Sequence, residues 1–248
     1  DLCIQACADD PQVAFHAIRN LIRIAGGRAV VAWQQLGFGR TASTTTTQVT
    51  ARNLFGFKDG TNNLKVEDPD LLKKHVWTSS QNSANSPAWM EGGSYLATRR
   101  IRMNIETWDR TRLREQEEIV GRTKTTGAPL SGGEEFTKPD FSAMGRSGPL
   151  IPADSHMRLM HPDQNQGVQI LRRGFNYTDG ADELGRLDAG LFFIAYVCDP
   201  RTHFIPMLST MTASDAMSEY LRHTGNALFA VPPGVKDEND YICSGLFS

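Results

Sequence analysis

Apolar residues near the start of the chain recur with the spacing of one helix face. Between residues 11 and 24 they stand three or four positions apart, and Pro11 suits a first helical turn, so we expect a helix there. The short apolar runs at residues 2–6 and 29–33 are typical of strands. The pattern therefore predicts a strand–helix–strand piece at the beginning of the chain.

A longer unit with both strand and helix patterns begins at residue 94. The predicted strands are residues 94–105, 168–173, 190–198 and 227–231. The predicted helices are residues 108–120 and 215–222. The order strand–helix–strand–strand–helix–strand is that of the split β-α-β, or ferredoxin-like, arrangement. We therefore predict an α+β fold with one complete ferredoxin-like unit.

Segments without periodicity separate these elements. Residues 37–48 are rich in Gly, Ser and Thr, which is typical of a linker. Residues 127–151 form a predicted loop long enough to indicate a function. We expect residues 1–50 to be the C-terminal remnant of a first ferredoxin-like domain plus a linker, and residues 51–248 to be a second domain. Because the chain starts at Asp1 and not at Met, we also expect a missing N-terminal part.

Composition narrows the classes of function. The chain has 248 residues, with 26 Lys and Arg against 28 Asp and Glu, a formal net charge of -2. A near-neutral chain argues against a dedicated nucleic-acid binder, which carries a basic excess. The longest apolar run, residues 190–198, is too short to span a bilayer.

The cysteines say little about metal, redox or disulfide sites. The four are Cys3, Cys7, Cys198 and Cys243. None forms a CxxC pair, which argues against a zinc ribbon or a thioredoxin-type site. Cys3 and Cys7 lie in a predicted strand and are expected to be core thiols, whereas pairing of Cys198 with Cys243 stays open.

A tight glycine turn holds the first candidate for chemistry. Asp59 stands between Gly56 and Gly60, where glycines allow the backbone to approach a ligand closely. Its short carboxyl group has two interpretations. It is either an acid–base group beside a cofactor or the acceptor of an Asx-turn that only shapes the loop.

Histidine supplies the second candidate. The six histidines are His16, His75, His156, His161, His203 and His223, and none lies in an HExxH pattern. His16 is expected to be structural, and His75 and His223 are expected to be solvated. His156 closes the long Gly- and Pro-rich loop. A structural role is open to it, but so is that of a single axial haem ligand, which needs one well-held neutral imidazole.

Two arginines end the predicted strand at residues 168–173. Neighbouring strand residues point to opposite faces, so one of Arg172 and Arg173 must face the packed side of the sheet. A buried arginine needs a partner, which is either an ordinary ion pair or an anionic ligand. Leu191 and Phe193, two apart on the next strand, would give the same side an apolar surface.

Several segments, in order along the chain, resemble the DyP-type (dye-decolorizing) haem peroxidases. Residues 53–61, with the sequence NLFGFKDGT, are similar to the GxxDG signature of that family. Similar segments are residues 92–96, 108–111, 127–130, 154–159, 171–174 and 232–234. The branch most similar in these motifs is the one exported by the twin-arginine pathway and linked to bacterial iron uptake.

The resemblance implies a tandem ferredoxin-like (dimeric α/β-barrel-type) architecture and one haem b per chain. His156 would be the axial iron ligand, and Asp59 and Arg172 the catalytic acid–base residue and arginine on the opposite, distal side. Leu191 and Phe193 would line the peroxide side. Asp215 would accept a hydrogen bond from His156.

Two loops would contact the edge of the haem. The resemblance places the amides of Gly60, Thr61 and Asn62 there, followed by the loop His161, Pro162 and Asp163. The branch more usually has Asn-Pro-Arg in that second loop. Asp163 in place of a cation would not pair with a haem propionate.

The implied function is reduction of hydrogen peroxide with one-electron oxidation of dyes, phenolics or similar donors. Bulky dyes would be oxidised at the surface through tyrosine or tryptophan relays. The alternatives are a protein that releases iron from haem, a non-catalytic haem binder, and a ferredoxin-like module without haem. Asp59 and Arg172 together favour the peroxidase, because haem carriage needs neither. The family also implies a periplasmic or secreted location and a homo-oligomer.

Overall fold

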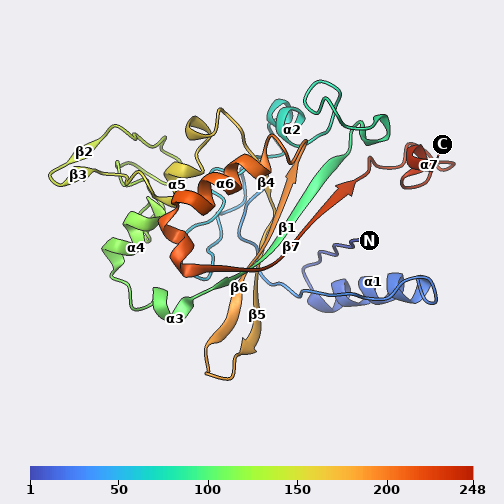
Figure 1. Ribbon diagram of the computed structural model, residues 1–248, viewed down its shortest axis with the longest axis horizontal. Coiled ribbons are helices and arrows are strands. Elements are labelled where there is room, and N and C mark those ends of the chain that lie inside the picture. The colour runs from blue at the N-terminus through green and yellow to red at the C-terminus, as the bar shows by residue number, and fades with distance from the viewer. Residues whose placement is uncertain (248) are drawn as a thin grey trace.

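An antiparallel five-stranded sheet is the framework of the computed structural model, which describes residues 1–247 (Figure 1). Its long strands are β1 (Ser94–Met103), β6 (Leu187–Val197) and β7 (Leu221–Val231). The order across the sheet is β4-β6-β1-β7, and β5 also pairs with β6. β4 (Leu171–Arg172) and β5 (Phe175–Ala181) therefore share the outer edge of β6.

This order confirms the predicted α+β, ferredoxin-like class. The two central strands are the first and third of the unit, and the last strand pairs with the first, as split β-α-β topology requires. Every pairing is antiparallel. Within residues 1–247 the sheet does not close into a barrel.

Helices gather on one side of this sheet (Figure 1). They are α3 (Ile105–Trp108), α4 (Leu113–Val120), α5 (His156–Leu159), α6 (Phe204–Ser214) and the 3₁₀ helix η3 (Ala216–Tyr220). The remaining short elements are α2 (Pro69–His75), η1 (Ala88–Met90), β2 (Met144–Gly145), β3 (Gly148–Pro149), η2 (Pro162–Gln164) and α7 (Ser244–Phe247). In the described part of the chain, no helix is both long and apolar enough to cross a bilayer.

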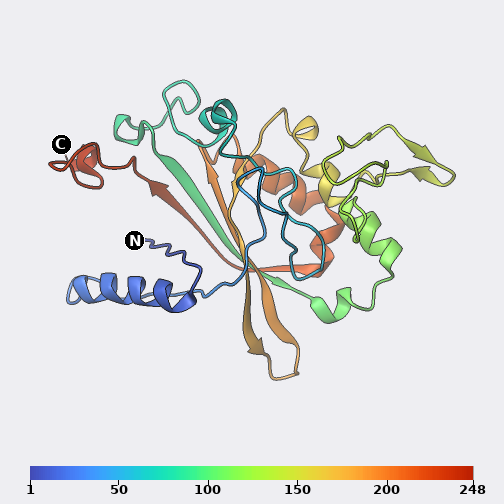
Figure 2. The ribbon, with the colours of Figure 1, turned by 180° about the vertical axis from the view of Figure 1, so that it is seen from behind.

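The N-terminal prediction is half right. Helix α1 (Pro11–Ile24) forms as expected, with the Asp10 side chain accepting a hydrogen bond from the Gln12 amide. The predicted strands at residues 2–6 and 29–33 are wrong, because both segments are exposed and irregular. Strand conformation depends on a pairing partner, and no described strand lies beside them. Figure 2 shows α1 and the N-terminus standing apart from the sheet.

Two predicted helices also need correction. The helix expected at residues 108–120 begins only at Leu113, as α4, because residues 109–112 form a turn after α3. The Gln116 amide holds this turn by donating hydrogen bonds to the carbonyls of Trp108 (2.7 Å) and Thr111 (3.2 Å). The helix expected at residues 215–222 is the short η3 followed by β7. The pattern missed α6, whose apolar residues do not form one stripe, and β5, which lies between the strands predicted at residues 168–173 and 190–198.

The burial of several cysteines and histidines differs from expectation. Cys3 and Cys7 are exposed, because the strand that was to bury them does not form, and Cys198 and Cys243 are both free thiols. His16 is exposed on α1, whereas His75, expected to be solvated, is buried at 2% exposure against His203. These side chains lie outside the cavity described below.

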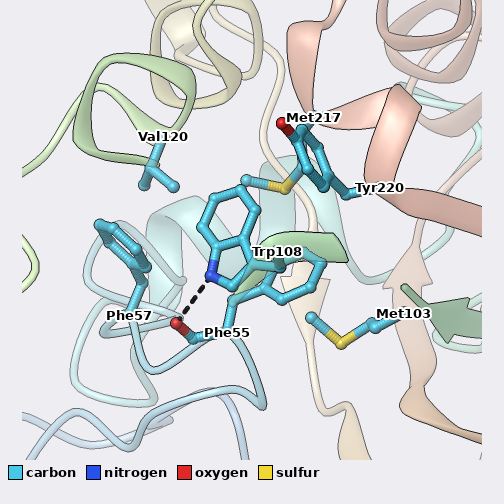
Figure 3. Close-up of a cluster of buried hydrophobic side chains, with 7 residues drawn as sticks. All are labelled: Phe55, Phe57, Met103, Trp108, Val120, Met217 and Tyr220. Carbon is cyan, nitrogen blue, oxygen red and sulfur yellow. Dashed lines mark hydrogen bonds between the residues drawn. The ribbon is translucent and has the colours of Figure 1, made fainter. Parts of the chain in front are cut away.

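A cluster of buried aromatic and apolar side chains joins the sheet to the helices (Figure 3). Its members are Phe55, Phe57, Met103, Trp108, Val120, Met217 and Tyr220. Trp108 stacks on Phe55 with ring centroids 4.3 Å apart and meets Tyr220 edge-on at 5.0 Å. Its indole N–H donates a hydrogen bond to the Phe55 carbonyl at 3.2 Å. The indole therefore fixes the loop that leads into the glycine turn.

We predict that Trp108→Ala lowers the free energy of unfolding by about 3–5 kcal/mol, because it removes a fully buried ring and leaves a cavity. Urea denaturation followed by circular dichroism measures this. Trp77→Ala is the matched control, since the Trp77 side chain is 49% exposed and its loss should change stability by less than about 0.5 kcal/mol. Equal effects of the two substitutions would contradict the central position of Trp108.

Candidate functional site

A cavity of about 230 Å³ lies between the helix-covered face of the sheet and the loops around residues 53–62 and 156–172. Asp59, Arg172, His156, Leu191 and Phe193 all line it. Its other walls are mostly apolar and come from α5, α6, β1 and β7. The structure thus brings the main candidates together although they are far apart in sequence.

The glycine turn holds Asp59 in one position. Gly60 has φ +101°, and a Cβ there would lie 2.6 Å from the Ala42 Cα, so only glycine fits without a shift. The Asp59 amide donates to the Ala51 carbonyl at 2.9 Å, and the Asn53 amide group donates to the Asp59 carboxylate at 3.2 Å. The carboxylate is therefore fixed from both ends.

Arg172 forms an ion pair with Asp59, and both side chains line the cavity. Its Nη1 lies 2.5 Å from the Asp59 Oδ1. Asn63 secures the backbone of Arg172, because its Oδ1 accepts from the Arg172 amide (2.8 Å) and its Nδ2 donates to the Arg172 carbonyl (3.0 Å). Arg173 points elsewhere and contacts the Thr44 hydroxyl at 3.3 Å. Arg172 is therefore the inward-facing member of the pair.

His156 begins α5 and faces the cavity from the helix side. Its Nδ1 lies 2.6 Å from the Asp215 Oδ2, and the other Asp215 oxygen accepts from the Met217 amide at 2.9 Å. Burial alone lowers the pKa of His156, but the buried Asp215 carboxylate outweighs this and raises that pKa above its usual value. Because Nδ1 is engaged, Nε2 remains available on the cavity side.

A second hollow of about 370 Å³ adjoins the cavity. Thr61, Asn62, His161 and Pro162 line both spaces, Gly60 lines only the first, and Asp163 only the second. The Asp163 carboxylate pairs with Lys138 at 3.3 Å. The two predicted contact loops therefore meet at the junction of the hollows, and Asp163 faces a cation of its own chain.

The long loop at residues 127–151 reaches this junction through Glu135, which sequence reasoning missed. Its carboxylate pairs with Lys58 and accepts a hydrogen bond from the Thr61 hydroxyl at 3.1 Å. Burial raises the pKa of Glu135, but these contacts and Thr50 outweigh it and lower the pKa below its usual value. The charged Glu135 side chain thus holds the loop against the glycine turn.

Three further residues of the site were also missed: Asn63, which holds Arg172 from behind the cavity wall, and Arg99 and His223, which line the cavity. Asn63 follows Asn62 directly after the glycine turn, where a short amide side chain is a signal for hydrogen bonds to the backbone. Arg99 lies on the inward face of a predicted strand, and that position was its only signal. His223 was expected to be solvated, but β7 begins at Leu221 and turns His223 toward the cavity, where burial lowers its pKa to about 4.

Two family models together match most of the chain. Residues 50–236 match the family model described as Dyp-type peroxidase, C-terminal, and residues 1–39 match the one described as Dyp-type peroxidase, N-terminal. The chain belongs to the DyP-type peroxidase family. This confirms the resemblance inferred from the motifs.

Relatives within the family include two curated proteins named Deferrochelatase. Those of Escherichia coli strain K12 and Yersinia pseudotuberculosis are each 39% identical over 99% of this chain. The chain spans 56–58% of the length of these relatives.

Solved structures of the family have the same fold. DtpA of Streptomyces lividans, solved as an oxyferrous complex, superposes with a TM-score of 0.88 at 42% identity, over 97% of this chain and 65% of that one. A DyP-type peroxidase of Cellulomonas bogoriensis gives 0.86 at 36% identity, over 98% and 65%.

The His156–Asp215 pair predicts a pH dependence of stability. Because the pKa of His156 is raised on folding, the pair stabilises the folded protein fully below about pH 6.5, and this stabilisation is lost as the pH rises through the folded value. We expect Asp215→Asn to flatten this fall. Urea denaturation of the cofactor-free protein between about pH 5 and pH 9 measures it.

The control for this experiment is His16→Gln, on the exposed face of α1. It should leave the pH profile as in the unsubstituted protein. A slope above pH 6.5 that persists in Asp215→Asn would show that Asp215 is not the partner that raises the pKa.

Proposed function

We propose that the protein is a haem-dependent peroxidase that reduces hydrogen peroxide and oxidises dyes, phenolics or similar donors by single electrons. The observation that carries this proposal is the placement of the Asp59–Arg172 pair and His156 in one cavity. A protein that only carries haem needs an axial ligand but no acid–base group beside an arginine. Membership of the DyP-type peroxidase family supports the same conclusion.

The residues present fit a haem b group, one per chain. His156 offers an imidazole Nε2 whose ring is oriented by an anionic partner, which makes it a stronger ligand. The cavity wall is apolar around Leu191 and Phe193, and its polar groups Arg99 and His223 have buried atoms without partners among the described residues. When bound, haem would supply an iron that takes up peroxide and a macrocycle that exchanges single electrons.

Asp59 and Arg172 would have different roles in the cleavage of peroxide: proton transfer and charge stabilisation. The O–O bond breaks heterolytically when one oxygen loses a proton and the other gains it, so that the departing oxygen leaves as water. Asp59 is placed to accept that proton and return it, directly or through a water molecule. Arg172 carries a guanidinium group that can stabilise negative charge on the departing oxygen. Two electrons and two protons from donors complete the reduction to water.

The junction of the two hollows would surround the edge of the bound group. Gly60, Thr61 and Asn62 from the glycine turn, with His161 and Pro162 from η2, are the residues placed to contact it. Asp163 has no such role in this proposal, because its carboxylate faces Lys138. The expected export from the cytoplasm, the homo-oligomer and the division near residue 50 stay predictions.

A second candidate function is the release of iron from haem. It is favoured by the relatives named Deferrochelatase. Such a reaction exchanges iron for two protons on the porphyrin nitrogens and leaves the ring intact. Its product, the iron-free porphyrin, fluoresces, so the two functions can be separated in one sample.

We predict that Asp59→Ala lowers kcat for peroxide-dependent dye oxidation by roughly 10²–10⁴-fold, because the proton shuttle is lost. Arg172→Ala should lower it by roughly 10²–10³-fold. Arg173→Ala is the matched control, since that side chain points away from Asp59 and should leave kcat within about twofold. Stopped-flow or steady-state absorbance of the haem-loaded protein gives these rates.

His156→Ala tests haem binding itself. We expect loss of the haem absorption spectrum seen with the unsubstituted protein, because the axial ligand is removed. An unchanged spectrum would show that another residue binds the iron. Porphyrin fluorescence that grows without any dye oxidation, in a sample supplied with peroxide, would favour the iron-releasing alternative.

A further inference from the structure

We propose that Arg99 and His223 form a carboxylate-binding subsite on the inner wall of the cavity, which takes a propionate of the bound porphyrin. The inference rests on the proposed haem binding and extends it to residues for which the motifs gave no role. A carboxylate of a small reducing substrate bound beside the porphyrin has the same chemistry and is the other possible source.

Strand register places the two side chains on one face of the sheet. Arg99 pairs with Phe193 of β6, and Ile101, two residues further on β1, pairs with His223 of β7. Residues two apart on a strand share a face, so Arg99, Ile101 and His223 all look toward the helices. All three line the cavity together with Phe193.

The polar atoms of this pair have no partner within residues 1–247. Arg99 Nε and Nη1 and His223 Nε2 are buried and make no hydrogen bond. The two residues also interact unfavourably, because the positive charge of Arg99 adds to burial in lowering the pKa of His223. A buried charge without a partner is strongly unfavourable, so we expect an anion beside Arg99 and within reach of His223.

Arg100, the next residue on β1, is a useful comparison because its guanidinium is paired with side chains of the same chain. Its guanidinium binds Asp179 (2.7 Å), Asp188 (3.0 Å) and Gln35 (2.9 Å) on the opposite face of the sheet. No comparable set surrounds Arg99 among the described residues. The same residue type, one position apart, is thus fully paired outside the cavity and unpaired inside it.

Among residues 1–247, the carboxylates that line or adjoin the cavity are already engaged. Asp59 binds Arg172, and Asp215 binds His156. An external anion is therefore the partner left for Arg99. The bound group proposed here carries carboxylates on an otherwise apolar ring, and the cavity has the matching character: apolar walls with an isolated cation. This match favours a porphyrin propionate over an inorganic anion.

The test uses iron-free protoporphyrin IX and its dimethyl ester as probes, because neither depends on His156. Fluorescence titration of the cofactor-free protein should show tighter binding of the diacid. In Arg99→Met, diacid affinity should fall roughly ten- to hundredfold while ester affinity stays unchanged. Arg99→Lys should retain part of the preference. Arg222→Met, exposed on the opposite face of β7, removes the same charge and should change neither affinity.

Thermal unfolding separates ligand binding from a structural role. In the cofactor-free, unsubstituted protein the Arg99 charge is buried and unpaired, which lowers stability. Arg99→Met removes this charge, so the variant should melt at or above the temperature of the unsubstituted protein, although it binds the diacid less well. A lower melting temperature together with equal losses for diacid and ester would overturn the proposal, since both then reflect damaged packing.

Two further measurements identify which molecule supplies the carboxylate and separate a failure of the Arg99 subsite from a failure of the proposed haem binding. If Arg99→Met leaves porphyrin affinity unchanged but abolishes binding of benzoate to the haem-loaded protein, the carboxylate comes from a small acid and the subsite stands. If both affinities are unchanged, the subsite is wrong. His156→Ala should keep the preference for the diacid over the ester. Failure of the axial assignment therefore shows in the haem spectrum alone, independently of Arg99.

Discussion

The contact between the glycine turn and β4 is the constraint around which the cavity is built. Asp59 and Arg172 attract each other as an ion pair, but Asn63 sets the distance by clamping the Arg172 backbone on both its amide and its carbonyl. These two hydrogen bonds matter because an ion pair alone allows many side-chain geometries. With backbone and side chain both fixed, the carboxylate and the guanidinium present one arrangement to whatever enters the cavity.

On the opposite wall of the cavity, a second carboxylate, that of Asp215, fixes both a side chain and a backbone segment. Asp215 is fully buried, caps η3 through the Met217 amide and orients the His156 ring. The Trp108 cluster joins the two walls, since Phe55 precedes the glycine turn and Met217 and Tyr220 belong to η3. Packing within this cluster (Figure 3) therefore links the segment that leads to the glycine turn with η3, each of which carries one wall.

Local patterns predicted what depends on neighbours in sequence, and long-range contacts decided the rest. Alternation and turn residues located β1, β6 and the C-terminal part of β7, and the motif order identified Asp59, His156 and Arg172 as candidates. The strand at residues 2–6 failed because a strand needs a partner that periodicity does not supply. α6 was missed because a helix apolar on several faces has no stripe. The position of His223 followed from where β7 begins, which no local signal marks.

The arginines of β1 and β4 extend this argument from fold to ligand. A folded chain can satisfy a buried guanidinium with its own acids, as it does for Arg100 and Arg172. Where it leaves one unsatisfied in a cavity, the unfavourable free energy is part of the empty protein and disappears when an anion binds. Arg99 is such a group, beside His223 and facing apolar walls. Stability without ligand and affinity for ligand are therefore opposed at this position, so the residue is explained by binding and not by folding.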